Sequence, residues 1–315
     1  MEEYISKMKL VKLYVLAILI IGGLILFNQV KAARLSISPV TFELTGNPGD
    51  VLVNKLRIFN PTNSSIAVRM EVEDFTAAGE EGEVIVKEAE AETYSLARWI
   101  SVSPQTFTLG PKEQKFVDFI ITIPQNAEPG GKYGSVLATM KGILSPDEGI
   151  GGAAVSTKVG ALVLLTVSGD VLENIEVKEF LVPGFSETGP ITFTIRFENT
   201  GTVHVRPRGF VTITDWRSEK VIDIEFPQQN VIPGAVRKVE ANWDKKWLFG
   251  RFSATLVGNY GTGNLPIDPP VVVFWVFPWR ITLGIFLGLL LVITYFVKTR
   301  RRWKLALKIL IRGEK

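Results

Sequence analysis

Hydrophobic and polar residues alternate along much of residues 34–276, and this alternation is typical of half-buried β-strands. The alternating segments are rich in Val, Ile, Thr and Phe, which favour strands. Turns rich in Gly, Pro and Asn separate them at intervals of about 8–12 positions. The clearest strand segments are residues 34–38, 54–59, 67–72, 116–123, 191–197 and 210–213. Short strands at this spacing predict an all-β fold of Ig-like β-sandwiches.

An internal similarity divides this β region into two parts. The pairs of similar segments, in the same order in each part, are 56–63 with 195–202, 103–115 with 226–238, and 129–136 with 248–255. Three ordered matches predict two tandem copies of one sandwich. We expect the first domain over residues 33–169 and the second over residues 170–276, with the boundary near Gly169.

Two stretches interrupt the alternation. Residues 80–92 contain six glutamates, and we interpret them as a solvated excursion from the first domain. Residues 145–152 are rich in glycine and acidic residues and show no hydrophobic period. They are expected to form a surface loop that joins two strands.

The N-terminus has the pattern of a secretion signal. Lys7, Lys9 and Lys12 precede an uncharged apolar run over residues 13–27, which is short for a membrane span. Val30 and Ala32 fit the −3 and −1 positions of a cleavage site. Residues 1–32 are therefore expected to be a signal peptide cleaved after Ala32, and the alternative is an uncleaved anchor.

A second apolar segment near the C-terminus predicts a transmembrane helix, placed at residues 277–297. Its core, residues 281–297, is uncharged and covers roughly 26 Å as a helix. Apolar residues extend it upstream over residues 271–277. The expected membrane-interface residues are Trp275, Trp279 and Arg280 on the outer side and Lys298, Arg300, Arg301 and Arg302 on the inner side.

Basic residues on both flanks predict the topology. The cluster after the span and the basic residues before the signal run both stay on the cytoplasmic side. We therefore expect a single-pass protein of the cell membrane, with residues 33–278 outside and the C-terminus inside. The tail, residues 298–315, has the pattern of a basic amphipathic helix. It either lies on the anionic inner leaflet or acts only as a stop-transfer signal.

Composition narrows the function classes. The 315 residues suit about two domains, and 46% hydrophobic residues suit a packed core. The net charge of +3 comes from the ends, because residues 34–297 contain 23 basic and 29 acidic residues. A nucleic-acid partner is therefore not expected.

The sequence contains little catalytic chemistry. It has no cysteine and one histidine, so disulfides, thiolate metal sites and a cysteine nucleophile are excluded. His204 stands opposite Val203 and Val205 in an alternating segment, which predicts a surface position on a strand. Asp74 and Asp215 follow strands at similar places in the two repeats, and we interpret both as turn residues. We expect no enzyme activity, no metal and no cofactor, although a hydrolase with an unrecognised acid pair is an open alternative.

The ectodomain tryptophans allow two interpretations. Most tryptophans of a sandwich are core or corner residues. Trp243 and Trp247 could instead form an exposed pair that contacts a glycan or a protein.

Several motifs resemble the WxL-interacting cell-surface proteins of bacteria. They are residues 35–44, Gly49 with Asp50, the strand end at residues 60–63, and the Gly-Gly-Lys-Tyr-Gly run at residues 130–134. The order of signal, two Ig-like domains, one span and a basic tail is also similar. The resemblance implies that the first domain binds peptidoglycan and the second binds a partner protein or host ligand. Residues 35–44 are also similar to the N-terminal domain of periplasmic pilus chaperones. Those chaperones are soluble, so the C-terminal span of this chain departs from their pattern.

These observations favour a membrane-anchored, non-enzymatic surface protein that binds the cell wall or a partner protein, for example by strand addition. The alternative is an assembly or signalling subunit of a membrane complex that acts through its span and tail.

Overall fold

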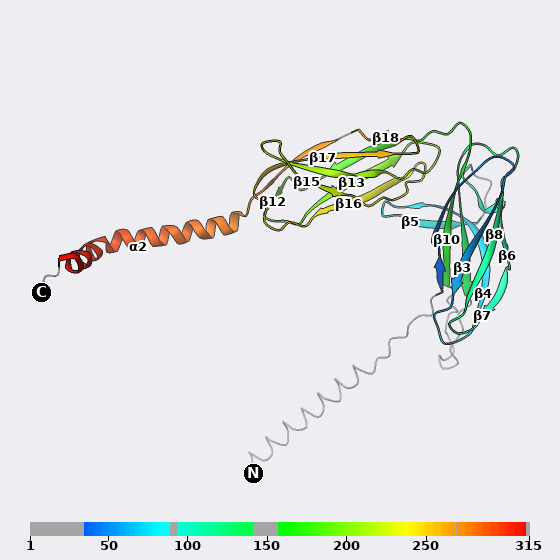
Figure 1. Ribbon diagram of the computed structural model, residues 1–315, viewed down its shortest axis with the longest axis horizontal. Coiled ribbons are helices and arrows are strands. Elements are labelled where there is room, and N and C mark those ends of the chain that lie inside the picture. Colours follow the sequence, from blue (N-terminus) through cyan, green and yellow to red (C-terminus); the bar gives the residue numbers. More distant parts are fainter. Residues whose placement is uncertain (1–34, 89–92, 141–156, 269, 313–315) are drawn as a thin grey trace, which may run out of the picture.

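The computed structural model describes residues 35–88, 93–140, 157–268 and 270–312, with side chains as far as Thr299. The expected signal peptide, the expected loop at residues 145–152 and the side chains of Arg300, Arg301 and Arg302 lie outside the described residues. The described chain consists mostly of strands, followed by one C-terminal helix (Figure 1).

The strands before residue 170 form two sheets, which we call sheets A and B, and the strands after it form sheets C and D. Sheet A has the order β1-β3-β8-β6, from β1 (Ser36–Ser38), β3 (Val51–Phe59), β8 (Gln114–Thr122) and β6 (Ile100–Ser103). Sheet B has the order β2-β10-β9-β4-β5, from β2 (Thr41–Gly46), β10 (Thr157–Val167), β9 (Gly130–Met140), β4 (Ile66–Ala78) and β5 (Glu83–Lys87). β7 (Thr106–Leu109) pairs with β4, and the 3-10 helix η1 (Ala97–Trp99) precedes β6.

Sheets C and D repeat this order. Sheet C is β11-β13-β16, from β11 (Ile175–Leu181), β13 (Ile191–Asn199) and β16 (Val236–Trp243). Sheet D is β12-β19-β17-β14-β15, from β12 (Phe185–Ser186), β19 (Val271–Val276), β17 (Gly250–Tyr260), β14 (Arg208–Asp215) and β15 (Lys220–Glu225), with β18 (Leu265–Pro266) beside β17. In each half the second strand lies parallel to the last one, β2 to β10 and β12 to β19.

Each pair of sheets encloses its own hydrophobic core, because alternate side chains of each strand point inward. Phe119, Leu56 and Leu165 are fully buried between sheets A and B. Phe193, Phe197 and Phe274 are buried between sheets C and D. We call residues 35–167 the N-terminal half and residues 171–276 the C-terminal half.

A buried asparagine stands at the end of β3 and of β13, the third strand of each half, in the same way. The Asn60 side-chain amide donates to the carbonyls of Ser64 (2.8 Å), Leu109 (3.3 Å) and Gly110 (2.8 Å). The Asn199 amide donates to the carbonyls of Val203 (2.8 Å) and Val231 (2.7 Å). Each side-chain oxygen accepts the backbone N–H two residues later. Leu109 thus corresponds to Val231, one residue from the alignment expected from the sequence.

The expected strands are confirmed, but two other expectations are wrong. Of the stretch 80–92, expected as a solvated excursion, the structure describes residues 80–88, and these are not simply solvated, because β5 and the β4–β5 turn are folded against the molecule. Asp74 lies inside β4 instead of following a strand. Its carboxylate accepts the backbone N–H groups of Leu96 (2.9 Å) and Ala97 (2.7 Å) at the start of η1. Asp215 is the last residue of β14, and its carboxylate has the expected turn role, because it accepts the N–H groups of Arg217 and Glu219 in the turn that follows.

The C-terminal helix α2 (Trp279–Arg312) leaves the C-terminal half at the end opposite the N-terminal half (Figure 1). Within the described residues, Trp279–Thr299 is the one helical stretch long and apolar enough to cross a membrane. At about 1.5 Å per residue, its 21 residues cover roughly 31 Å. The upstream residues 271–276, expected as an extension of the span, are strand β19.

We expect the Asn199→Asp substitution to lower the free energy of unfolding of the C-terminal half by about 3 kcal/mol. The reason is that a carboxylate cannot donate to the buried carbonyls of Val203 and Val231. Thermal unfolding of the detergent-solubilised chain, followed by intrinsic fluorescence, measures the change. Asn242→Asp is the control, because Asn242 is exposed and its oxygen only accepts from Thr192, a role that a carboxylate keeps. Equal effects of the two substitutions would contradict this account.

Candidate functional site

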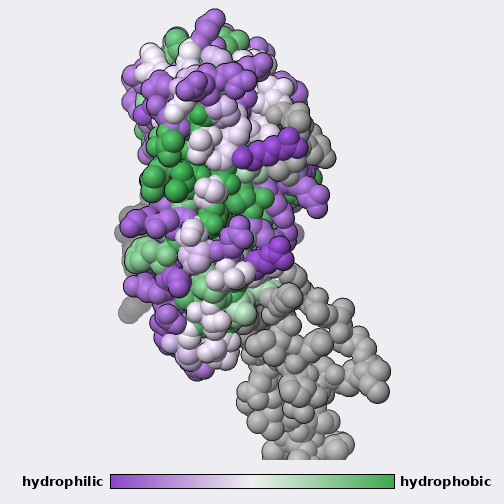
Figure 2. All heavy atoms as spheres, turned by 90° about the vertical axis from the view of Figure 1, so that its right-hand side faces the viewer, coloured by the Kyte–Doolittle hydropathy of each residue, from purple (hydrophilic) through white to green (hydrophobic). Residues whose placement is uncertain are grey.

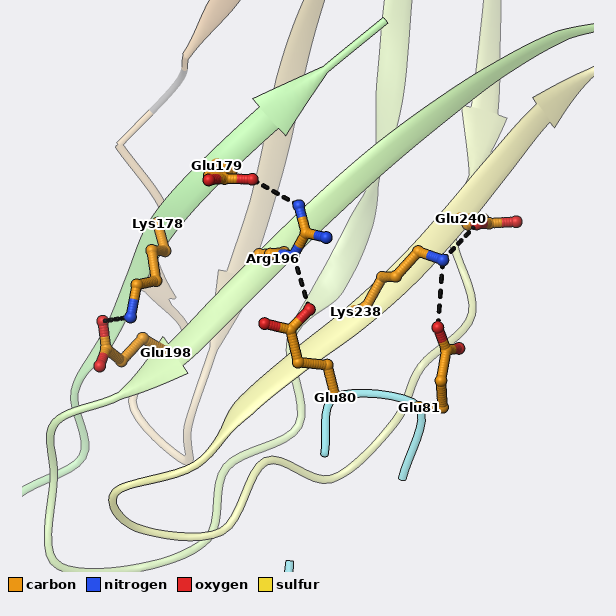
Figure 3. A network of polar contacts seen from close by, with 8 residues as sticks. All are labelled: Glu80, Glu81, Lys178, Glu179, Arg196, Glu198, Lys238 and Glu240. Carbon is orange, nitrogen blue, oxygen red and sulfur yellow. Dashed lines mark hydrogen bonds and ion pairs between the residues drawn. The ribbon is translucent and has the colours of Figure 1, made fainter. Parts of the chain in front are cut away.

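The two halves meet at a joint formed by the β4–β5 turn and sheet C. The turn, residues 79–82, extends from sheet B and lies over strands β13 and β16 (Figure 3). The backbone N–H of Lys238 in β16 donates to the carbonyl of Glu80 at 2.8 Å. The turn therefore covers part of the open edge of sheet C, which would otherwise leave a strand unpaired.

Two ion-pair groups reinforce this contact (Figure 3). Glu80 accepts the Nε–H of Arg196 at 2.6 Å, and Arg196 also pairs with Glu179. Lys238 Nζ lies 3.1 Å from Glu81 and 2.9 Å from Glu240. Glu240 and then Glu81 raise the pKa of Lys238, so its charge persists well above neutral pH. Single exposed ion pairs contribute little, but here two of them act together with a backbone hydrogen bond.

A second polar contact lies on the other side of the joint. Glu43 of β2 pairs with Arg206, and the Asn230 amide donates to the same carboxylate at 2.6 Å. The Gly131 N–H donates to the Thr202 carbonyl at 2.8 Å. These contacts attach sheet B to the C-terminal half at points distant from the β4–β5 turn in the sequence.

A small apolar cluster fills the space between these polar contacts. Phe75, Tyr133 and Leu164 of the N-terminal half are buried there, and Ile232 of the C-terminal half packs against them. Beside the cluster is a cleft of about 280 Å³, lined in part by Arg206 and Arg237.

The two arginines of the cleft, Arg206 and Arg237, are already engaged by other side chains. The Arg237 side chain lies across Gly82, where a Cβ atom would come within 1.6 Å of the guanidinium. Its Nε–H donates to Gln229 at 2.8 Å, and burial lowers the pKa of Arg237. Since Arg206 is paired with Glu43, this ion pair also holds the two halves together.

His204 is not the surface strand residue expected from the sequence. It lies outside the named strands, partly buried, with its ring edge-on to Tyr133 at 5.9 Å between centroids. Its Nδ1 atom is buried and has no hydrogen-bond partner in the described part of the chain. Burial lowers the pKa of His204, so the ring is neutral at pH 7.

The outer face of sheet A, which points away from the joint, carries exposed apolar side chains. Val51 and Val53 of β3 and Ile120 of β8 are exposed beside one another, since Val53 lies directly opposite Ile120. Phe116 of β8 is also exposed on this face, further along the strand, beyond the Lys55–Asp118 ion pair. Figure 2, which faces this side of the molecule, shows hydrophobic residues gathered at mid-height. We call these four residues the sheet A patch. The sequence contains its signal, since Val51-Leu52-Val53 is apolar without alternation.

The expected pair of exposed tryptophans does not form. Trp243 is only 3% exposed and packs edge-on against Phe252 in the core, at 5.3 Å between centroids. The reason is the register, since Trp243 is an inward position of β16 in line with Val239 and Ala241. Trp247 is exposed, in the loop that follows β16.

The expected outer membrane-interface residues lie at the base of α2. Trp275 is in β19 with an exposed side chain, Trp279 begins the helix, and Arg280 stacks on Trp279 at 5.5 Å. Lys298 is exposed near the other end of the apolar stretch. No group of three or more His, Asp or Glu side chains suited to a metal occurs among the described residues.

No protein-family model matches the sequence, and neither does any curated protein. Among solved structures, the chain is similar to a chaperone–tip adhesin complex of CFA/I fimbriae biogenesis, with 13% identity, a TM-score of 0.39, and coverage of 77% of this chain and 99% of that chain. It is similar to the Salmonella enterica SafA pilin in complex with the SafB chaperone (13%, TM-score 0.35, 78% and 98%) and to the E. coli chaperone DraB (12%, TM-score 0.34, 77% and 97%). At TM-scores this low, the likeness carries no argument, and we base both fold and function on the chain itself.

We expect the Glu80→Lys substitution to loosen the joint, because it places a cation against Arg196. Nitroxide labels at Ser101→Cys and Ser218→Cys report the distance between the halves by pulsed electron resonance. The absence of native cysteine makes this labelling specific. We expect a clearly broader distance distribution in the variant.

The control for this measurement is Lys178→Glu, which breaks the Lys178–Glu198 pair of sheet C (Figure 3). That pair lies within one half, so its loss should leave the distance distribution unchanged. A distribution that is equally narrow in all three proteins would show that the turn does not fix the joint.

We expect His204 to make the protein less stable as the pH falls below 6.5. A base whose pKa is lowered by folding binds fewer protons in the folded than in the unfolded state. The stability it contributes is therefore complete above the unfolded value of 6.5 and is lost as the pH falls toward the lower folded pKa. Thermal unfolding at pH 7.5 and 5.5 tests this. His204→Asn should have a smaller difference between the two pH values, and an unchanged difference would exclude His204 as the cause.

Proposed function

We propose that this chain is a single-pass membrane protein that presents two tandem Ig-like β-sandwich domains outside the cell and binds a partner protein there without catalysis. The domains are residues 33–169 and 170–276. The helix anchors them, and the basic tail lies in the cytoplasm.

The two-domain arrangement is supported by the repeated strand order, the separate cores and the matching asparagines. The parallel pairing of an early strand with the last strand in both halves is a specific feature that random similarity would not repeat. The anchor is supported by the apolar length of Trp279–Thr299, and the orientation by the basic residues that follow it.

The observation that carries the binding proposal is the sheet A patch. A face made of two valines, an isoleucine and a phenylalanine suits a protein interface, whose centre is apolar. Polysaccharide binding depends more on hydrogen bonding and flat aromatic stacking. Peptidoglycan binding by the first domain, which the resemblance to WxL-interacting proteins implies, is the competing outcome.

A non-enzymatic role is supported by the two aspartates considered for an acid pair. The Asp74 carboxylate accepts two backbone N–H bonds and one from Ser95 (2.6 Å), and it lies in the N-terminal half. Asp215 is in a turn of the C-terminal half. The two carboxylates therefore stabilise separate local structures.

The experiment is site-specific photocrosslinking from Val53 in the full-length protein in its native membrane. We expect a discrete envelope protein to crosslink to wild-type protein and to be lost in the Val51→Asp, Ile120→Asp double variant, which leaves position 53 free for the probe. Val40→Asp is the matched control, because Val40 is 66% exposed, as Val51 is 58% exposed, and lies outside sheet A. It should keep the crosslink.

Retention of the same proteins on isolated peptidoglycan separates the two ligand classes. Retention that survives the double variant, with no crosslink from Val53, would overturn partner-protein binding in favour of wall binding. The absence of both signals would count against any surface-binding role.

A further inference from the structure

Three connections of the C-terminal half meet at the end from which α2 leaves. Strand register places them there, because Gly250 pairs with Val276 at the end of β19, and Asp215 pairs with Phe252 two residues further along β17. Ser186 of β12 lies beside Val276 as well. The connections are residues 187–190, 216–219 and 244–249. We call this end, with the base of α2, the helix-proximal end.

Large aromatic side chains are exposed on these connections. Trp216 is 69% exposed, Trp247 is 59% exposed and Phe249 is 72% exposed. They come from two loops, Trp216 from residues 216–219 and the other two from residues 244–249, and none belongs to the hydrophobic core. Leaving three such side chains in water forgoes the apolar burial that aromatic residues normally provide. The fold itself does not require them.

Trp216 and Trp247 are each accompanied by a cation from the next or preceding residue. Arg217 lies over Trp216 at 5.3 Å and Lys246 over Trp247 at 5.8 Å. The same arrangement occurs at the helix base, where Arg280 lies over Trp279. An aromatic ring beside a cation suits the boundary between hydrocarbon and water, where rings settle at the headgroups and cations reach the aqueous side.

The connection between the helix-proximal end and α2 is too short to act as a flexible linker. Only Phe277 and Pro278 separate β19 from the helix. The Phe277 N–H donates to Ser186 at 3.0 Å, and the Phe249 and Phe277 rings lie 5.4 Å apart. Glu187 accepts the Arg280 N–H at 3.2 Å and lies 3.5 Å from its guanidinium, so the helix start is bonded to the folded half.

We propose that the helix-proximal end rests on the outer surface of the bilayer and inserts Trp216, Trp247 and Phe249 into the lipid headgroup region. This inference rests on the proposed function, since it requires α2 to span the membrane. The occupant of the exposed aromatic surface is thus lipid, because the span brings that surface to the membrane with no intervening linker.

The contact depends on the aromatic rings more than on anionic lipid. Arg217 is balanced by Asp215 (3.4 Å) and Glu219 (3.7 Å), and Arg280 is balanced by Glu187. With these charges paired within the protein, zwitterionic lipid suffices as the partner.

The test uses full-length single-cysteine variants, which the cysteine-free sequence permits, reconstituted in phosphatidylcholine nanodiscs. Nitroxide labels at Ser218→Cys and Lys245→Cys report the two loops, and Ser101→Cys in sheet A reports a water-exposed site. We expect collision with a water-soluble nickel chelate to be severalfold lower at Ser218 and Lys245 than at Ser101. Equal accessibility at the three sites would overturn the proposal.

A second arm removes the rings. The Trp216→Ser, Trp247→Ser, Phe249→Ser triple variant should raise nickel accessibility at Ser218 to the level of Ser101. These side chains are exposed, so the fold should tolerate the change. Phe116→Ser, an exposed aromatic on sheet A, is the matched control and should leave the value unchanged. An unchanged value in the triple variant would also overturn the proposal.

A label at Leu287→Cys, within α2, separates failure of this proposal from failure of the membrane anchor. Protection of Leu287 from nickel together with exposure of Ser218 means that the protein is anchored but stands clear of the bilayer. Exposure of Leu287 means that α2 does not span, and the surface contact then fails together with the anchor.

Discussion

The contact between the β4–β5 turn and sheet C determines how the two halves of this protein are arranged. Each half has its own core, so neither core constrains the position of the other. The turn connects them through a backbone hydrogen bond from Lys238 and ion pairs from Glu80 and Glu81, and the contacts of Glu43 and Gly131 and a small apolar cluster around Tyr133 add to it. Gly82 is part of this constraint, because only a residue without a side chain leaves room for Arg237 across the turn.

The strands were predictable because their signal is local. Alternation identifies β3, β8 and β13 directly, and the apolar length of residues 281–297 identifies the helix. The matching strand ends at Asn60 and Asn199 were visible as an internal similarity. Their role as buried donors to carbonyls was not, since the partners lie about 30 to 50 residues away in the sequence.

The joint was not predictable, for a related reason. Glutamates near residue 80 look like ordinary solvated charge until Arg196 and Lys238 are brought opposite them by folding. Trp243 and Trp247 are only four residues apart, but β16 ends at Trp243, which is an inward position, whereas Trp247 lies in the loop that follows. His204 was placed on a surface because its neighbours alternate, whereas its actual surroundings come from Tyr133 in the other half.

The short link between β19 and α2 has a mechanical consequence. A tether of many flexible residues would let the ectodomain turn freely and reach partners at varied heights. Here a rotation of α2 about its own axis also rotates the C-terminal half. The N-terminal half, which is attached at the joint, then moves in a circle around the same axis. Under the membrane anchoring proposed above, the sheet A patch would sweep a circle at one height above the lipid, which suits a partner held at that height in the same membrane.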